Sequence, residues 1–290
     1  MKYGCQSMVD DVKIMLLKRP DAAFINQKFS DESFKRCGWF NSPNYEKSIK
    51  EYEAFERIIT DHVPEVYFLP QDERTELDSI YAHDSFKITK KGVIYFTMGK
   101  VSRKGEPAAA RKYLESIGIP TLGQIEPPGS VEGGDVLWLD EKTAAIGRSY
   151  RTNDEGIRQF AELVKGFIDV IPVPIPHADG EDYILHLMSL ISPVDKDLAV
   201  VYSKYMPCFF REMLIERGIE LIETPDDEYD ILGTNVLALA PRKCVMLKGS
   251  PKVKEMLIKA GAEVIEYEGD HISIPGTGGA TCFTAPLYRE

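Results

Sequence analysis

The chain has 290 residues, of which 43% are hydrophobic and 28% charged, so it can bury a sizeable core in one or two domains. Its formal net charge of −11 opposes binding to nucleic acid or to an anionic membrane surface, because both need basic patches. No apolar run reaches the roughly 20 residues of a membrane span. Asp10 and Asp11 lie where a signal peptide would be apolar, so we expect a cytoplasmic protein.

The cysteine and histidine residues argue against two kinds of site. The five cysteines are scattered without CxxC spacing, and the five histidines form no HxxxH or HExxH pair. A disulfide framework or a structural zinc site needs closer and more regular spacing. We therefore expect no metal, and nothing in the sequence calls for another cofactor.

The first elements are predicted near the N-terminus. Residues 12–20, VKIMLLKRP, have the composition of a strand, and residues 45–70 that of a helix followed by a strand. Residues 37–47, CGWFNSPNYEK, precede this helix. We interpret them as a capping loop in which Ser42–Pro43 starts the helix, although Trp39 and Phe40 also suit a lid that excludes water from a pocket.

Four later segments share one pattern. Each consists of an apolar run, a short polar turn and a second apolar run, which indicates a β-hairpin. The hairpin segments begin at Asp84, Gly134, Leu187 and Thr234. Helical patterns follow them over residues 106–120, 153–167, 206–219 and 250–264, and further strands are predicted at residues 170–175, 219–225 and 263–269.

The predicted helix boundaries also recur. Asn153 and Ser250 are the expected N-caps, and Pro107 and Pro251 occupy first-turn positions. Glycines are expected to end three of the helices, at Gly118, Gly218 and Gly261. Because turns, caps and stops recur together, we interpret the chain as repeats of a strand–strand–helix–strand unit with a period of roughly 50 residues.

A fifth unit can be assembled from the two ends of the chain. Residues 282–288 and 12–20 would form its hairpin, and residues 45–70 its helix and third strand. Five units closed into a ring would place both termini in one unit, so we predict a single α/β domain over residues 1–290. The alternative is an ordinary α/β sheet whose pieces are similar only in composition.

Polar residues recur where each unit's first strand is predicted to start. They are two acids (Asp84 and Glu132), an imidazole (His186), an amide (Asn235) and a thiol (Cys282). Equivalent positions in a ring would face one axis, and several polar groups that meet in one place are typical of an active site. Two carboxylates suit a planar guanidinium, whose carbon a thiolate can attack, while a histidine can transfer protons.

The glycines before Cys282 support this interpretation. Gly276, Gly278 and Gly279 allow the backbone to approach another part of the chain closely or to turn sharply and present the thiol. The alternative for Cys282 is a packed core residue. We interpret the remaining cysteines in that way, as inert small hydrophobes: Cys5, Cys37, Cys208 and Cys244.

The chain resembles the guanidine-modifying pentein superfamily of five-bladed α/β propellers, and within it the dimethylarginine dimethylaminohydrolases. The resemblance covers most of the chain from about Asp78 to Cys282. It depends on LDSIYAHDSF, EGGDVL, GRSYRTN, HLMSL and the late cysteine, which follow one another in the family's order. Each motif is weak alone, but five in order form a specific pattern.

The resemblance implies a role for each site residue. Cys282 would form a covalent thiouronium, with His186 as acid and base. Glu132 and Asp84 would hold the guanidinium, and Asp78 would be a further substrate contact. Arg151 would grip the substrate's carboxylate. The resemblance also implies a five-bladed propeller fold. The partner would be a small guanidine, either arginine or a methylated arginine, which the enzyme would hydrolyse to citrulline and an amine. Homo-oligomerisation is left open.

The resemblance implies a second arginine contact, Arg103, in a stretch that is more similar to arginine deiminases. Met188 departs from the superfamily, because deiminases and amidinotransferases have an Asp there. This argues against a deiminase or an amidinotransferase; arginine deiminase, arginine dihydrolase and amidinotransferase stay as alternatives. A non-catalytic propeller that binds a partner is the alternative of another class.

Simpler roles also suit the site residues. His186 could be a hydrogen-bonded core residue, and Glu132 an exposed turn acid. Asp84 could cap a turn, and Asn235 could satisfy only backbone groups. Asp78 and Arg151 could form surface ion pairs, and we expect Arg103 at the surface, because basic residues surround it.

Overall fold

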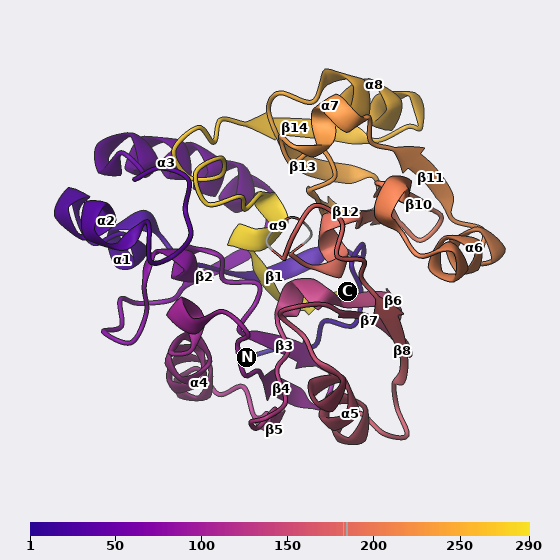
Figure 1. Cartoon of the computed structure of the whole chain (residues 1–290), viewed down its shortest axis with the longest axis horizontal. Coiled ribbons are helices and arrows are strands. Elements are labelled where there is room, and N and C mark those ends of the chain that lie inside the picture. Colours follow the sequence, from indigo (N-terminus) through magenta and orange to yellow (C-terminus); the bar gives the residue numbers. More distant parts are fainter. Residues whose placement is uncertain (182, 184) are drawn as a thin grey trace.

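The computed structural model describes residues 1–181, 183 and 185–290. These residues form five three-stranded sheets with helices between the strands (Figure 1). In four sheets the first two strands form an antiparallel hairpin, and the third lies parallel to the second. These sheets contain β3 (Phe86–Thr89), β4 (Gly92–Tyr95) and β5 (Thr121–Gln124); β6 (Val136–Asp140), β7 (Thr143–Arg148) and β8 (Asp169–Pro174); β9 (Ile191–Asp195), β10 (Leu198–Val201) and β11 (Glu220–Glu223); and β12 (Val236–Ala240), β13 (Lys243–Leu247) and β14 (Glu263–Tyr267).

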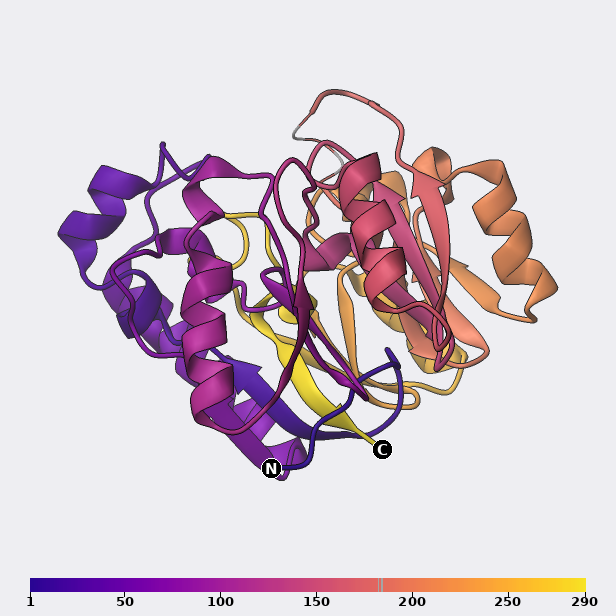
Figure 2. The same cartoon turned by 90° about the horizontal axis from the view of Figure 1, so that it is seen from below.

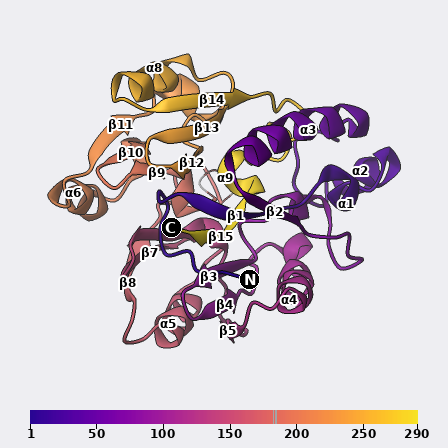
Figure 3. The ribbon, with the colours of Figure 1, turned by 180° about the vertical axis from the view of Figure 1, so that it is seen from behind.

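The fifth sheet joins the two ends of the chain. Its central strand β1 (Val12–Leu17) pairs antiparallel with β15 (Ala285–Arg289) and parallel with β2 (Glu65–Phe68). Its pairing pattern is therefore that of the other four sheets, with β15 in the place of a first strand. Both termini lie on the same side of the molecule (Figure 2) and near its middle when it is seen from behind (Figure 3).

Five longer helices lie on the outside of the molecule, one for each sheet (Figure 1). They are α3 (Tyr45–His62), α4 (Glu106–Ser116), α5 (Asp154–Leu163), α6 (Cys208–Glu216) and α8 (Pro251–Lys259). Short helices and turns complete the described elements: α1 (Pro20–Ala23), α2 (Gln27–Ser33), α7 (Asp226–Tyr229), α9 (Ala280–Phe283), and the 3₁₀ turns η1 (Leu77–Ile80), η2 (Val101–Arg103), η3 (Gly133–Asp135), η4 (Leu187–Ser189) and η5 (Ser203–Tyr205). No helix in these described ranges has the length and apolarity to cross a membrane.

Most predicted helix ends are correct. Asn153 caps α5 by accepting a hydrogen bond from the Gly156 amide. The glycines that follow α4, α6 and α8 have φ angles of +84°, +76° and +85°, which favour glycine and end a helix. One prediction was wrong: Asn44, not Ser42–Pro43, caps α3. Ser250 occupies the predicted N-cap position of α8, although its side chain makes no cap hydrogen bond.

The apolar core is divided among the contacts between neighbouring sheets. Among the described residues, five clusters each combine one pair of neighbouring sheets with one outer helix. Phe160 of α5, for example, packs with Ile94 of β4 and Val136 of β6. The cluster that includes α3 joins the sheet of β1 to the sheet of β12 and so completes the series. Burial of these side chains is the main force that holds the sheets together.

Hydrogen bonds link the same sheets close to the start of their first strands. The Gly133 amide donates to the Asp84 carbonyl at 2.8 Å, and the Leu187 amide donates to the Asp135 carboxylate at 2.8 Å. The Val236 amide donates to Ser192 Oγ at 3.2 Å. The Thr281 amide donates to Asn235 Oδ1 at 3.1 Å, and the His83 amide donates to the Cys282 carbonyl at 3.2 Å. These hydrogen bonds run from each sheet to the next and return to the sheet of β3, so the links form a closed cycle.

Candidate active site

Cys282 lies in the middle of the molecule, on the one-turn helix α9. The sequence predicted a strand at this position, but β15 begins three residues later. The preceding glycines bring the backbone against other parts of the chain. A Cβ atom on Gly278 would lie 2.2 Å from the Tyr81 ring, and one on Gly279 would lie 2.5 Å from the Asn235 side chain. The prediction that these glycines permit a close approach is therefore correct.

The Cys282 thiol is partly exposed and has polar neighbours. Asn235 Nδ2 donates to its sulfur at 3.3 Å. Burial, reinforced by the negative charge of Asp84, raises the pKa of Cys282 to about 11. The resting group is therefore a thiol, and it needs a nearby positive charge to become a nucleophilic thiolate at neutral pH.

His186 and Glu132 form the shortest contact between predicted catalytic residues. His186 Nε2 lies 2.8 Å from Glu132 Oε2, and the Glu132 side chain is fully buried. The interpretation of Glu132 as an exposed turn acid is therefore wrong. Burial alone would raise the pKa of Glu132, but the hydrogen bond and charge of His186 outweigh it and lower that pKa to about 2.

The same contact favours a protonated imidazole. Burial alone would lower the pKa of His186, but the carboxylates of Asp84, Glu132 and Asp135 raise it above its usual value. The shift therefore favours the protonated, positively charged form of His186 more than in a free histidine. A protonated histidine beside a carboxylate can donate its proton to a leaving amine and recover it later.

Residues next to His186 hold it in place. A Cβ atom on Gly134 would lie 2.5 Å from His186 Nδ1, so only glycine fits against the imidazole at this position. The buried Asp135 accepts hydrogen bonds from the Leu187 amide at 2.8 Å and from Ser149 Oγ at 2.6 Å. These bonds tie the turn that carries His186 to the neighbouring sheet. The EGGD motif contained Asp135, but its type and position gave no sign of this positioning role.

Asp84 is held between a backbone amide and a buried arginine. Gly134 donates its amide to Asp84 Oδ1 at 2.9 Å, and Arg103 binds the other carboxylate oxygen. The Arg103 side chain also binds Glu106, and it is only 4% exposed. The expectation that Arg103 lies at the surface is therefore wrong, because two acids stabilise its charge inside the protein.

Asp78 is also buried, and its carboxylate accepts bonds from three side chains. Trp39 Nε1 donates at 2.9 Å, Ser102 Oγ at 3.0 Å, and Lys100 Nζ lies 2.9 Å away. The Lys100 amide donates to Glu132 Oε1 at 3.0 Å. Lys100 therefore connects the two acids, a role that the sequence did not indicate, because other basic residues surround it.

Arg151 also lies beside Glu132. Its Nη1 atom is 3.5 Å from Glu132 Oε2, and the arginine side chain is 13% exposed. It is therefore part of the same cluster, and the interpretation as a surface ion pair is wrong for both Arg151 and Asp78.

The structure thus brings all seven predicted site residues into one region. Within the described ranges no hydrogen bond joins Cys282 to His186, but the charge of Asp84 acts on both groups. The cluster combines a thiol, an imidazole whose pKa is raised and buried carboxylates, which suits attack on a cationic carbon centre. The part of the chain described here contains no cluster of His, Cys, Asp and Glu suited to a metal ion.

Of the cysteines interpreted as core residues, Cys5, Cys37 and Cys244 are buried. Cys208 is exposed at the start of α6, so the core interpretation is wrong for this residue. Its apolar neighbours in the sequence belong partly to the outer face of the helix, where Phe209 and Ile215 are also exposed.

Comparison with solved structures identifies the fold. The chain has a TM-score of 0.77 with dimethylarginine dimethylaminohydrolase from Pseudomonas aeruginosa, solved as a cysteine-to-serine mutant in complex with citrulline, at 22% identity over 95% of this chain and 99% of that one. It has a TM-score of 0.81 with the product-bound N-terminal domain of ArgZ, an arginine dihydrolase from cyanobacteria, at 16% identity over 97% of this chain and 98% of that one. The fold is that of the guanidine-modifying pentein enzymes.

Sequence comparison narrows this class. Residues 19–289 match the family described as N,N dimethylarginine dimethylhydrolase, eukaryotic, and the chain belongs to this family. The Pseudomonas aeruginosa dimethylarginine dimethylaminohydrolase is 31% identical over 123 residues, which are 42% of this chain and 48% of that protein. Together these relationships support an enzyme of the guanidine-modifying hydrolase type.

Proposed function

We propose that this protein hydrolyses a C–N bond in the guanidine group of arginine or an N-methylated arginine, and that it releases citrulline and ammonia or an alkylamine. The observation that carries the proposal is the His186–Glu132 contact of 2.8 Å in the cluster that contains Cys282 and Asp84. Its family membership and the citrulline complex of the Pseudomonas aeruginosa relative support the same substrate class. We further propose that the five sheets are the blades of one propeller domain.

Asp84 and Glu132 would hold the substrate guanidinium between them. Both carboxylates are buried, so their attraction for a planar cation is screened less than it would be in water. The cation would also favour ionisation of Cys282, whose pKa is otherwise about 11. The thiol proton would pass to solvent water as the guanidinium binds, and the thiolate would attack its carbon.

His186 would complete the first half of the reaction. The C–S bond forms, the tetrahedral intermediate collapses, and the C–N bond breaks as His186 donates its proton to the leaving amine. The product is a thiouronium on Cys282. Neutral His186 then accepts a proton from water, which attacks the same carbon, and cleavage of the C–S bond gives the ureido product and restores the enzyme.

The arginines would have different tasks. Arg151, which is partly exposed beside Glu132, would bind the substrate's carboxylate. Arg103 is committed to Asp84 and Glu106, so we propose that it orients Asp84 and lies behind the substrate. Asp78 would contribute to substrate binding through its ion pair with Lys100, whose side chain is 23% exposed, and not as an isolated acid.

The test is a panel of arginine, monomethylarginine, dimethylarginine, agmatine and citrulline, with ureido product and released amine both measured. We expect ureido product in equal amount to the released amine, and a mass adduct on Cys282 after acid quenching. Ammonia from arginine without any alkylamine from methylated substrates would contradict the dimethylaminohydrolase assignment. Transfer of the amidino group to an added amine, or binding without turnover, would identify an amidinotransferase or a binding protein instead.

A further inference from the structure

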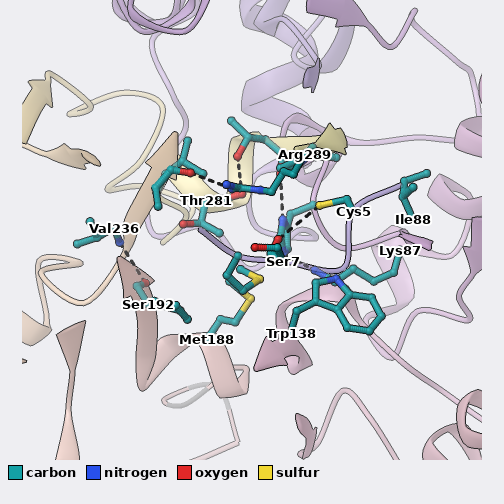
Figure 4. A pocket seen from close by; sticks show the side chains of 18 of the residues that line it. Cys5, Ser7, Lys87, Ile88, Trp138, Met188, Ser192, Val236, Thr281 and Arg289 are labelled. Atoms are coloured by element: carbon teal, nitrogen blue, oxygen red, sulfur yellow. Dashed lines mark hydrogen bonds between the residues drawn. The ribbon is translucent and has the colours of Figure 1, made fainter. Parts of the chain in front are cut away.

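A second polar region lies deeper along the same first strands. Its pocket is lined by residues such as Cys5, Lys87, Ser192, Ala238 and Arg289. His83, Met188 and Thr281 also line it, and each is within two residues of the active-site residue Asp84, His186 or Cys282. Figure 4 shows Lys87, Cys5 and Arg289 gathered at this pocket. The lining of this pocket therefore includes sequence neighbours of three residues of the proposed active site.

Arg289 brings a buried positive charge to this pocket without a carboxylate in contact. It is only 8% exposed, and its two terminal nitrogens donate to the backbone carbonyls of Asp10 and Ala238. Its Nε–H is buried and has no hydrogen-bond partner. A buried donor without a partner is costly, and its presence beside a pocket points to a missing acceptor.

Lys87 brings a second buried positive charge. It is 7% exposed, and its Nζ lies 2.7 Å from His83 Nε2. His83 Nδ1 lies 2.9 Å from the Thr284 carbonyl and must donate to it, so Nε2 is the acceptor and the imidazole is neutral. The contact with His83 therefore satisfies one N–H donor of Lys87, but it does not neutralise the positive charge of the lysine.

The surrounding groups do not supply a counter-charge at contact distance. Asp84 acts on Lys87, and Asp10 and Asp11 act on Arg289, only through space. The Cys5 thiol donates to the Ser7 carbonyl at 3.6 Å, lies close to Lys87 and is a side-chain hydrogen-bond partner of the Arg289 guanidinium, whose Nε–H still has no partner. Among the described residues neither Lys87 nor Arg289 forms a salt bridge, which is unusual for buried charges.

We propose that the pocket binds one small monovalent inorganic anion, such as chloride, between Lys87 Nζ and Arg289 Nε. The anion would accept the free Nε–H and provide the counter-charge that the chain does not. The cavity volume of about 30 Å³ suits an ion of this size and is too small for a nucleotide or an amino acid. The ligand class follows from two cationic side chains that line one small cavity.

The experiment compares sodium chloride and sodium bromide with sodium gluconate at equal ionic strength, because gluconate is too large for the cavity. Thermal unfolding of the full chain should show a saturable rise in Tm of a few degrees with chloride or bromide over about 1–100 mM, and no such rise with gluconate. Bromide soaked into crystals should give one anomalous peak between Lys87 and Arg289. An equal response to gluconate, or no peak at this position, would overturn the proposal.

Two variants make the test specific. Lys87→Met keeps the side-chain length but removes the charge, and it should abolish the halide response. Lys259→Met, at the exposed end of α8, should keep it. A Lys87→Met protein that still responds to halide would contradict the site, and if this variant does not fold, the bromide position in the wild type decides. Cys5→Ser should also keep the response. A halide response that appears only after this substitution, and not in the wild type, would identify Cys5 as the internal counter-ion and would contradict the proposal.

Discussion

Arg103 and Arg289 are both buried guanidinium groups near the middle of the molecule, but their surroundings are opposite. Arg103 binds the carboxylates of Asp84 and Glu106, which outweigh the effect of burial and raise its pKa well above the usual value. Arg289 binds only backbone carbonyls through its terminal nitrogens, and burial lowers its pKa. The difference shows that one region of this protein neutralises a buried arginine with carboxylates, whereas the other holds it with backbone carbonyls, and the proposed anion would supply the counter-charge there.

This comparison assigns the chemistry to the acid-rich region, and Cys282→Ser is the strongest test of that assignment. Replacement of the sulfur should lower kcat/KM by more than about 10³-fold, because a serine hydroxyl without an adjacent base is a poor nucleophile. Cys208→Ser, which changes an exposed thiol on α6, is the matched control and should keep wild-type activity. Turnover by the Cys282→Ser protein would rule out the covalent mechanism.

The two arginines should differ in stability after the same substitution. Arg103→Met would leave Asp84 and Glu106 buried without their partner and should lower the free energy of unfolding by about 3–5 kcal/mol. Arg289→Met removes a cation that has no carboxylate partner, so we expect a loss of only about 1–2 kcal/mol, from its hydrogen bonds. Urea unfolding in a halide-free buffer measures both values, and equal losses would remove the distinction between the regions.

Glu132→Gln should change the pH dependence of catalysis. The substitution removes a carboxylate that raises the pKa of His186, so the imidazole should lose its proton at a lower pH. The alkaline limb of kcat should then move to lower pH, and kcat at the optimum should fall by about 10²-fold. An unchanged limb with reduced kcat would mean that Glu132 acts on the substrate and not through His186.

A smaller effect is expected from Asn235→Ala. Asn235 lowers the pKa of Cys282 through its hydrogen bond to sulfur, so its loss should shift thiol ionisation to higher pH. Alkylation of Cys282 by iodoacetamide at fixed pH should slow by roughly three- to tenfold, since the thiolate is the reacting species. The rate for Cys208 in the same protein is the internal control, and an equal decrease at both sites would contradict a specific effect.

The sequence predicted the repeated sheets because their signals are local. Apolar runs, polar turns, the Asn153 cap and the glycine stops each depend on a few neighbouring residues, and all are present in the structure. The collection of Asp84, Glu132, His186 and Cys282 in one region followed from the repeat itself. Their equivalent positions became neighbours once the sheets were linked in a cycle.

The burial of Arg103 depended on contacts that the repeat does not specify. Lys100 and Lys104 surround it in the sequence and suggest an exposed segment, although Glu106 at i+3 was a possible partner. The pocket between Lys87 and Arg289 had no sequence signal at all, because these residues are about 200 positions apart and belong to no shared motif. Side-chain partners across such distances require the tertiary structure.

The cycle of hydrogen bonds between sheets also has a consequence for biosynthesis. Strand β1 is made early, whereas its antiparallel partner β15 follows the strands of all four other sheets, and Cys282 lies just before β15. A growing chain can therefore contain the strands of those four sheets and still lack both Cys282 and the strand that pairs with β1. Under the proposed function, turnover should appear only once β15 has paired with β1, so turnover would report that the cycle of sheets is closed.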